Sequence, residues 1–178
     1  MRIISGKYRG RTIVPPRNLR ARPTTDFAKE NLFNVLGNLV DFEELDVLDL
    51  FSGTGSISYE FASRDAKSVT SVEVNSVHHN FIRQTARDLK FENFYATKAN
   101  VFLYLKSCTK KFDLIFSDAP YDLEGSEEVI RLVFERDLLN EDGILIFEHS
   151  KEQDVSMFPN YWQTRSYGSV KFSFFKKE

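Results

Sequence analysis

The run VLDLFSGTGSI over residues 47–57 constrains the fold of this chain more than any other stretch. A short apolar run bounded by turn residues is typical of a buried parallel strand. Gly53 and Gly55 have no Cβ, so the backbone there can turn sharply and approach a bound molecule closely. A helix that begins after such a turn points its free N–H groups at that molecule. The run therefore predicts a strand, a turn and a helix around a nucleotide-type ligand.

Strand and helix patterns alternate along the rest of the chain. We expect strands at 46–51, 67–74, 94–99, 112–117 and 143–147, and helices near 56–64, 76–90, 101–107 and 126–138. Before them, a hairpin or two short strands over residues 2–14 lead to a helix capped by Thr24 or Thr25. The link between two final strands, 161–167 and 169–176, is too short for a crossover, so these must be antiparallel. The pattern predicts an α/β fold with a mostly parallel sheet and helices on both faces.

Charge is distributed unevenly along the chain. Residues 1–25 contain seven basic and no acidic residues, whereas residues 26–178 contain 17 basic and 26 acidic ones. A basic segment on an acidic body favours a polyanionic partner such as RNA, although a solvated surface hairpin would carry the same charges. We expect two regions, a basic N-terminal hairpin and arm at 1–25 and an α/β domain at 26–178. The candidate RNA-binding residues are Arg2, Lys7, Arg9, Arg11, Arg17, Arg20 and Arg22.

The cysteine and histidine content limits the other possibilities. Cys108 is the only cysteine, and no apolar run has the length of a signal peptide or a membrane span. We therefore expect a cytoplasmic protein without a membrane partner. His78 and His79 are adjacent on an expected helix and point in different directions, which favours surface positions. His149 has no identifiable partner, so we expect no metal site.

Glu73 ends the second expected strand, downstream of the glycine turn. A carboxylate there can accept hydrogen bonds from both ribose hydroxyls of a nucleotide, although an exposed carboxylate at a strand end is the structural alternative. Ser58 stands where a dinucleotide-binding turn carries its third glycine, and Asp49 places negative charge where two phosphates would lie. Both residues favour S-adenosylmethionine, which carries a sulfonium and an ammonium, over a nicotinamide dinucleotide.

Asn100 follows the third expected strand, and two roles remain open for it. Its amide can hydrogen-bond the edge of an adenine, or it can cap the helix at 101–107. The backbone at this position can also contact the adenine while the side chain caps the helix. The candidate cofactor-binding residues are Asp49, Ser52, Gly53, Thr54, Gly55, Glu73, Val74, Asn100 and Val101.

The tetrapeptide Asp118-Ala119-Pro120-Tyr121 follows a buried strand. An amine on a nucleobase is a poor nucleophile because its lone pair is delocalised into the ring. A carboxylate and a backbone carbonyl that accept its two N–H bonds would favour the attacking form, and Tyr121 could stack on the base. The structural alternative is an Asp-x-Pro turn with a packed tyrosine. The candidate catalytic residues are these four.

These segments, together with the N-terminal region, resemble the bacterial 16S rRNA guanine-N2 methyltransferases (RsmD-like). The resemblance covers nearly the whole chain, and its most specific parts are RIISGKYRGR at 2–11 and RPTTD at 22–26. It implies a Rossmann-like methyltransferase fold, with a seven-stranded sheet whose last strand is antiparallel. It implies S-adenosylmethionine as the cofactor, which would contact the glycine turn, Glu73 and the Asn100 region.

The resemblance also implies the reaction, a methyl transfer to the N2 amine of a guanine in 16S rRNA of the small subunit or its assembly intermediate. Asp118 and the carbonyl of Ala119 would orient the amine, Tyr121 would stack on the base, and the N-terminal hairpin would help to grip the RNA. Glu148, at the end of the fifth strand, fits the family pattern.

Two residues depart from that pattern. Ala119 stands where the family usually has a proline, and Asn100 stands where it more often has an aspartate. An adenine-N6 methyltransferase acting on DNA or RNA remains an alternative, because the tetrapeptide serves both reactions. A non-catalytic RNA-binding assembly factor with the same fold is another. We expect the protein to act as a monomer.

Overall fold

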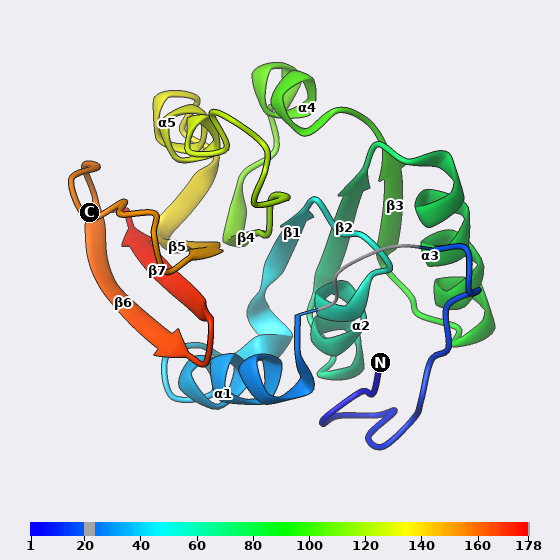
Figure 1. Cartoon of the computed structure of the whole chain (residues 1–178). Coiled ribbons are helices and arrows are strands. Elements are labelled where there is room, and N and C mark those ends of the chain that lie inside the picture. Colours follow the sequence, from blue (N-terminus) through cyan, green and yellow to red (C-terminus); the bar gives the residue numbers. More distant parts are fainter. Residues whose placement is uncertain (20–23, 178) are drawn as a thin grey trace.

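The structure, a computed structural model, describes residues 1–19 and 24–177. Within this part of the chain, one seven-stranded sheet has the strand order β3-β2-β1-β4-β5-β7-β6 (Figure 1). The strands are β1 (Asp46–Leu50), β2 (Ser68–Glu73), β3 (Phe94–Lys98), β4 (Phe112–Ser117), β5 (Leu139–Ser150), β6 (Tyr161–Tyr167) and β7 (Val170–Lys176). The α-helices are α1 (Asp26–Leu36), α2 (Ser56–Ser63), α3 (Ser76–Asp88), α4 (Val101–Ser107) and α5 (Glu128–Glu135), and a short 3-10 helix spans Phe42–Glu44.

The strand directions confirm the expected architecture. Strands β1 to β5 pair in parallel, and β7 runs antiparallel to both of its neighbours, β5 and β6. Thr25 is the residue that caps α1, because its hydroxyl accepts a hydrogen bond from the N–H of Ala28 at 3.1 Å. No helix among the described residues has both the length and the apolar character needed to cross a membrane.

Helices cover both faces of the sheet (Figure 1). Alternate residues of a strand point to opposite faces, and β1 follows this rule. Val47 belongs to the core formed with α1 and α2, whereas Leu48 belongs to the core formed with α4 and α5. This explains why the strand reads as a continuous apolar run, since both of its faces are buried.

Two elements differ in length from the expected ones. Strand β5 spans 139–150 rather than 143–147, because Leu139 pairs with Phe112 across a register shift and Ser150 pairs with Val170. The polar residues at 140–142 hide this extension from a search for apolar runs. Helix α5 is shorter than expected, since its regular turns cover only 128–135.

The N-terminal segment, residues 1–13, forms the expected hairpin, although without two regular strands. Its two arms meet at an antiparallel bridge between Arg2 and Thr12, and the N–H of Ile13 donates to the carbonyl of Met1 at 2.9 Å. The N–H groups of Ile4 and Ser5 donate to the carboxylate of Glu60 on α2, at 2.9 and 3.0 Å. The segment therefore folds against α2.

Close packing fixes this segment in place. Gly6 has a φ of +83°, and a Cβ on it would lie 1.9 Å from the carbonyl oxygen of Ser63, so only glycine fits there. Ile3 and Ile13 are buried in a cluster with Tyr59 of α2. The segment thus contributes to the hydrophobic core as well as carrying positive charge.

Candidate active site

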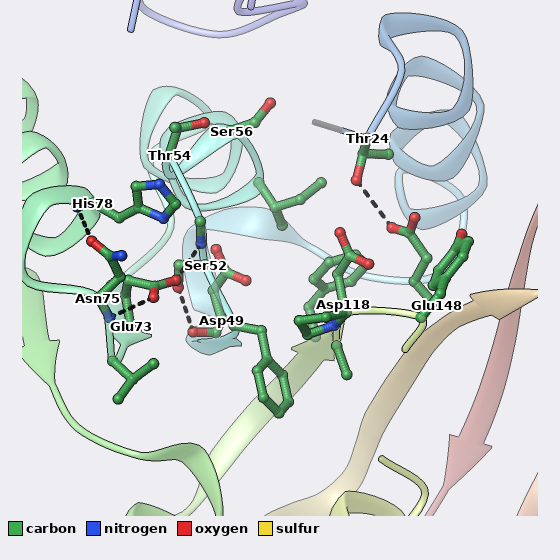
Figure 2. A pocket seen from close by; sticks show the side chains of 18 of the residues that line it. Thr24, Asp49, Ser52, Thr54, Ser56, Glu73, Asn75, His78, Asp118 and Glu148 are labelled. Carbon is green, nitrogen blue, oxygen red and sulfur yellow. Dashed lines mark hydrogen bonds between the residues drawn. The ribbon is translucent and has the colours of Figure 1, made fainter. Parts of the chain in front are cut away.

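A cavity of about 550 Å³ lies beyond the carboxyl ends of β1, β2, β4 and β5 (Figure 2). The chain order of the strands reverses between β1 and β4, and ligands of open α/β sheets bind at such a switch point. The lining residues come from the turns after these strands and from the start of α1. They include Thr24, Thr25, Asp49, Phe51, Ser52, Gly53, Thr54, Ser56, Glu73, Val74, Asn75, His78, Asp118, Ala119, Pro120, Tyr121, Glu148 and Val170.

The glycine turn has the sharp geometry that its sequence predicts. Gly55 is the N-cap of α2 with a φ of +89°, and a Cβ there would lie 2.5 Å from the ring of Tyr59. Gly53 also has a positive φ, of 56°. The hydroxyl of Ser52 donates to the carbonyl of Asp49 at 2.7 Å and fixes the start of the turn. The missing Cβ of Gly55 thus makes room for Tyr59, whereas Gly53 lines the cavity, where its backbone is open to a ligand.

Glu73 joins the turns that follow β1 and β2. Its two carboxylate oxygens accept hydrogen bonds from the N–H groups of Gly53 and Asn75, both at 2.8 Å. The residue is 8% exposed and lines the cavity, so it is not an exposed carboxylate at a strand end. Each oxygen keeps a further lone pair that can accept a bond from a ligand hydroxyl.

Asp49 is buried beneath the same end of the cavity. Ser58 donates a hydrogen bond to its carboxylate. Burial raises the pKa of the Asp49 carboxyl to about 7, the bonds from Ser58 and Ser52 oppose this shift, and the charge of Glu73 adds to it. A cation in the cavity would favour the ionised form of Asp49.

The tetrapeptide at 118–121 forms the opposite end of the cavity. The N–H of Asp118 donates to the carbonyl of Leu50 at 3.4 Å, which joins the ends of β4 and β1. Figure 2 shows the Asp118 carboxylate pointing into the cavity. Ala119 is buried, whereas Tyr121 is 41% exposed, so the ring is only partly covered by the protein.

Glu148 and Thr24 close the wall next to Asp118. The hydroxyl of Thr24 donates to the Glu148 carboxylate at 3.0 Å, and both residues are buried (Figure 2). This contact connects the residue before the N-cap of α1 to the end of β5. It places the two threonines of the RPTTD stretch, which the sequence singles out, at the cavity itself.

Three of the expected cofactor residues do not line the cavity. Gly55 is buried at the start of α2, and Val101 is buried in the core. Asn100 is exposed, and its side chain caps α4 by accepting a hydrogen bond from the N–H of Leu103 at 3.1 Å. The capping role of Asn100 is thus confirmed, and its contact with adenine stays a prediction.

Other lining residues escaped the sequence analysis. His78, interpreted as a surface residue, is half-buried and lines the cavity beside Asn75. The N–H of His78 donates to the side chain of Asn75, which caps α3 (Figure 2). An Asn followed by a helical pattern was the available signal, since a cap fixes the direction in which the first turn points.

His149, for which no partner was expected, has hydrogen-bond partners in the core. Its ring nitrogens lie 2.8 Å from the hydroxyl of Ser173 and 2.9 Å from the carbonyl of Ser150. In the described part of the chain, no group of three or more His, Cys, Asp or Glu side chains is arranged to hold a metal ion.

Five of the candidate RNA-binding residues are exposed on or near the N-terminal segment. They are Arg2, Lys7, Arg9, Arg11 and Arg17. Arg20 and Arg22 lie outside the described residues.

A buried lysine connects the N-terminal segment to the glycine turn. Lys29 of α1 is 1% exposed, and its ammonium donates to the carbonyl of Arg2 at 2.6 Å and to the hydroxyl of Ser56 at 3.1 Å. It also lies 3.8 Å from the buried carboxylate of Glu60. Burial lowers the pKa of Lys29, and the charge of Glu60 opposes this shift. Ser56 is the first residue of α2 and lines the cavity, so Lys29 supports one wall of the site.

A protein-family model described as "Conserved hypothetical protein 95" matches residues 1–176. The chain belongs to this family. A curated relative, "Ribosomal RNA small subunit methyltransferase D" from Haemophilus influenzae, is 31% identical over 166 residues, which cover 91% of this chain and 84% of the relative. The chain is accordingly a methyltransferase, as the sequence predicts.

Solved structures agree with the fold. The yhhF protein of Escherichia coli is 28% identical, with a TM-score of 0.88 over 100% of this chain and 98% of that one. The RsmC methyltransferase of Thermus thermophilus is 19% identical, with a TM-score of 0.71 over 87% of this chain and 44% of that one. At this lower identity the similarity concerns the fold alone. The expected Rossmann-like methyltransferase fold is confirmed.

Proposed function

We propose that this protein transfers a methyl group from S-adenosylmethionine to the N2 amine of a guanine in 16S rRNA. The proposal depends on one observation, that the Gly-x-Gly turn after β1 and the tetrapeptide at 118–121 line the same cavity. The curated relative's name, a ribosomal RNA small subunit methyltransferase, supports the RNA substrate.

The residues present fit the cofactor. Glu73 can accept bonds from ribose hydroxyls while it holds the turn, and the turn at Gly53 permits close approach of the backbone. Asp49 supplies negative charge to a cationic ligand. We assign to this end of the cavity Asp49, Ser52, Gly53, Thr54, Glu73 and Val74. S-adenosylmethionine supplies the methyl group.

The other end of the cavity suits an amine of a base. The Asp118 carboxylate and the carbonyl of Ala119 accept the two N–H bonds of the amine, which frees its lone pair and stabilises the positive charge that develops on nitrogen. Tyr121, partly exposed at the rim, stacks on the base. These contacts require the guanine to be unpaired or flipped out of its helix.

The exposed basic residues of the N-terminal segment bind RNA phosphates, so affinity decreases as salt increases. The partner we propose is 16S rRNA in the small subunit or its assembly intermediate, in the cytoplasm, with the protein acting as a monomer. The arm at 1–25 provides this contact, and residues 26–178 provide the catalytic domain.

The test is transfer of labelled methyl groups to unmodified small subunits, followed by digestion of the RNA to nucleosides. We expect label in N2-methylguanosine with the wild type and none with Asp118→Ala. Label in N6-methyladenosine would show that the methylated base is adenine and not guanine. RNA binding that survives Asp118→Ala, with no transfer by the wild type, would favour a non-catalytic assembly factor.

A further inference from the structure

An aromatic pair lies next to residues that line the cavity and has no role in the chemistry proposed above. Phe27, in the first turn of α1, contacts Tyr167, the last residue of β6, with ring centroids 6.4 Å apart and planes at 81°. Thr25, two residues before Phe27, lines the cavity. Val170, which pairs with Tyr167 across the β6–β7 hairpin, also lines it. The pair therefore adjoins the wall formed by Glu148.

Phe27 is 63% exposed, although α1 offers a buried face nearby. That face consists of Ala28, Leu32 and Leu36, which pack into the core. Tyr167 packs on that core through Phe172, at 6.1 Å, and so holds its position without Phe27. An exposed phenylalanine held edge-to-face against a fixed tyrosine presents an apolar ring to solvent.

Two arginines lie beside this surface, and one of them is paired with an acid. Arg2, whose side chain is 54% exposed, forms an ion pair at 4.0 Å with Asp26, the residue before Phe27. Arg165 is exposed and lies two residues before Tyr167 on β6, so both side chains point to the same face of the sheet. An exposed aromatic ring with arginines nearby matches a single nucleic acid strand, which has flat bases and an anionic backbone.

We propose that Phe27 and Tyr167 form a stacking platform for the base next to the target nucleotide of a single-stranded RNA segment. This inference rests on the proposed function and specifies how the RNA is held. When one base turns into the cavity, its neighbour loses a stacking partner. The two rings replace that partner and hold the RNA strand so that the target base stays aligned with Asp118.

The test compares Phe27→Ala, Phe27→Trp and the control Leu103→Ala. Leu103 is 66% exposed, close to the value for Phe27, but belongs to α4 on the other face of the sheet. We expect Phe27→Ala to raise the KM for unmodified small subunits by about 10-fold, as loss of one stacked base predicts. The kcat and the affinity for S-adenosylhomocysteine should stay within about 2-fold. Phe27→Trp should restore the KM, and Leu103→Ala should leave it unchanged.

Equilibrium binding of the same small subunits provides a readout independent of methyl transfer. Binding that weakens in Phe27→Ala and recovers in Phe27→Trp supports the platform. Equal binding by the wild type and Phe27→Ala would overturn it, even if the wild type makes N2-methylguanosine. If the wild type transfers no methyl group, the proposed reaction is wrong, and the binding series still decides whether these rings contact RNA.

Discussion

The two ends of the cavity are built differently. At the cofactor end, Glu73 is buried and both of its oxygens are held by backbone N–H groups, and Asp49 is 2% exposed. At the amine end, Asp118 is half-buried and Tyr121 is 41% exposed. The cofactor end is thus fixed by the fold, whereas the amine end leaves Tyr121 open to solvent, where we propose that the base enters. Substitutions at the cofactor end should therefore affect cofactor binding, and those at the amine end should affect methyl transfer.

The largest effect should come from Asp118→Ala. The substitution removes the side-chain acceptor for one N–H of the amine, so we expect methyl transfer to fall by about 10³-fold. Affinity for S-adenosylhomocysteine, measured by calorimetry, should change by less than about 3-fold. If cofactor affinity fell by as much as methyl transfer, the substitution at the amine end would also affect cofactor binding, which would contradict separate roles for the two ends.

The next largest effect should come from Glu73→Gln. The new amide places a donor against the N–H of Gly53 or Asn75, which leaves a buried group unpaired. We expect cofactor affinity to fall by about 100-fold and the free energy of unfolding to fall by about 1–3 kcal/mol. The kcat at saturating cofactor should be nearly unchanged, and the exposed Glu92→Gln should serve as a neutral control. A fall in kcat without a change in affinity would place Glu73 in the chemical step.

A smaller effect should follow from the raised pKa of Asp49. Below a pKa of about 7 the carboxyl is protonated and no longer attracts a cation, so affinity for S-adenosylmethionine should increase as pH rises. Between pH 6 and pH 8 we expect an increase of about 10-fold, measured by calorimetry, and a flat profile for Asp49→Asn. A slope that persists in Asp49→Asn would contradict the assignment of the effect to Asp49.

The smallest effect should come from Ala119→Pro. Pro120 already restricts residue 119 to extended conformations in the folded protein, and a second ring would also restrict the unfolded chain. We expect the transfer rate to change by less than about 3-fold and the free energy of unfolding to increase by about 0.5–1 kcal/mol, measured by denaturant titration. Complete loss of activity would indicate that the N–H of Ala119 has a required partner.

Local rules explain why the sheet and much of the site were predictable. Three features of the site can be recognised from adjacent residues alone. They are the Gly-x-Gly turn after a buried strand, the acid at a strand end and the Asp-x-Pro sequence. The carboxyl ends of parallel strands then bring them together without further information. The order of apolar runs therefore predicted where Glu73 and Asp118 lie.

Residues whose environment depends on distant partners were not predictable. Lys29 has the sequence context of a surface helix residue, and only the fold of the N-terminal segment provides the carbonyl of Arg2 that it contacts. The contact of the hairpin with α2 was not predictable for the same reason, because it depends on the distant carboxylate of Glu60, which binds the N–H groups of Ile4 and Ser5. Predicting that His78 lines the cavity would likewise have required knowing the direction in which α3 points.

The contacts of the N-terminal segment have a practical consequence for separating RNA affinity from folding. Deleting residues 1–13 would remove Arg2 and the amides that Glu60 binds, and would leave the buried ammonium of Lys29 with fewer partners. A truncated protein would lose stability and RNA affinity together, so its inactivity would not identify an RNA contact. Replacing the exposed Arg9 and Arg11 one at a time removes charge and keeps the fold, and makes the salt dependence of binding interpretable.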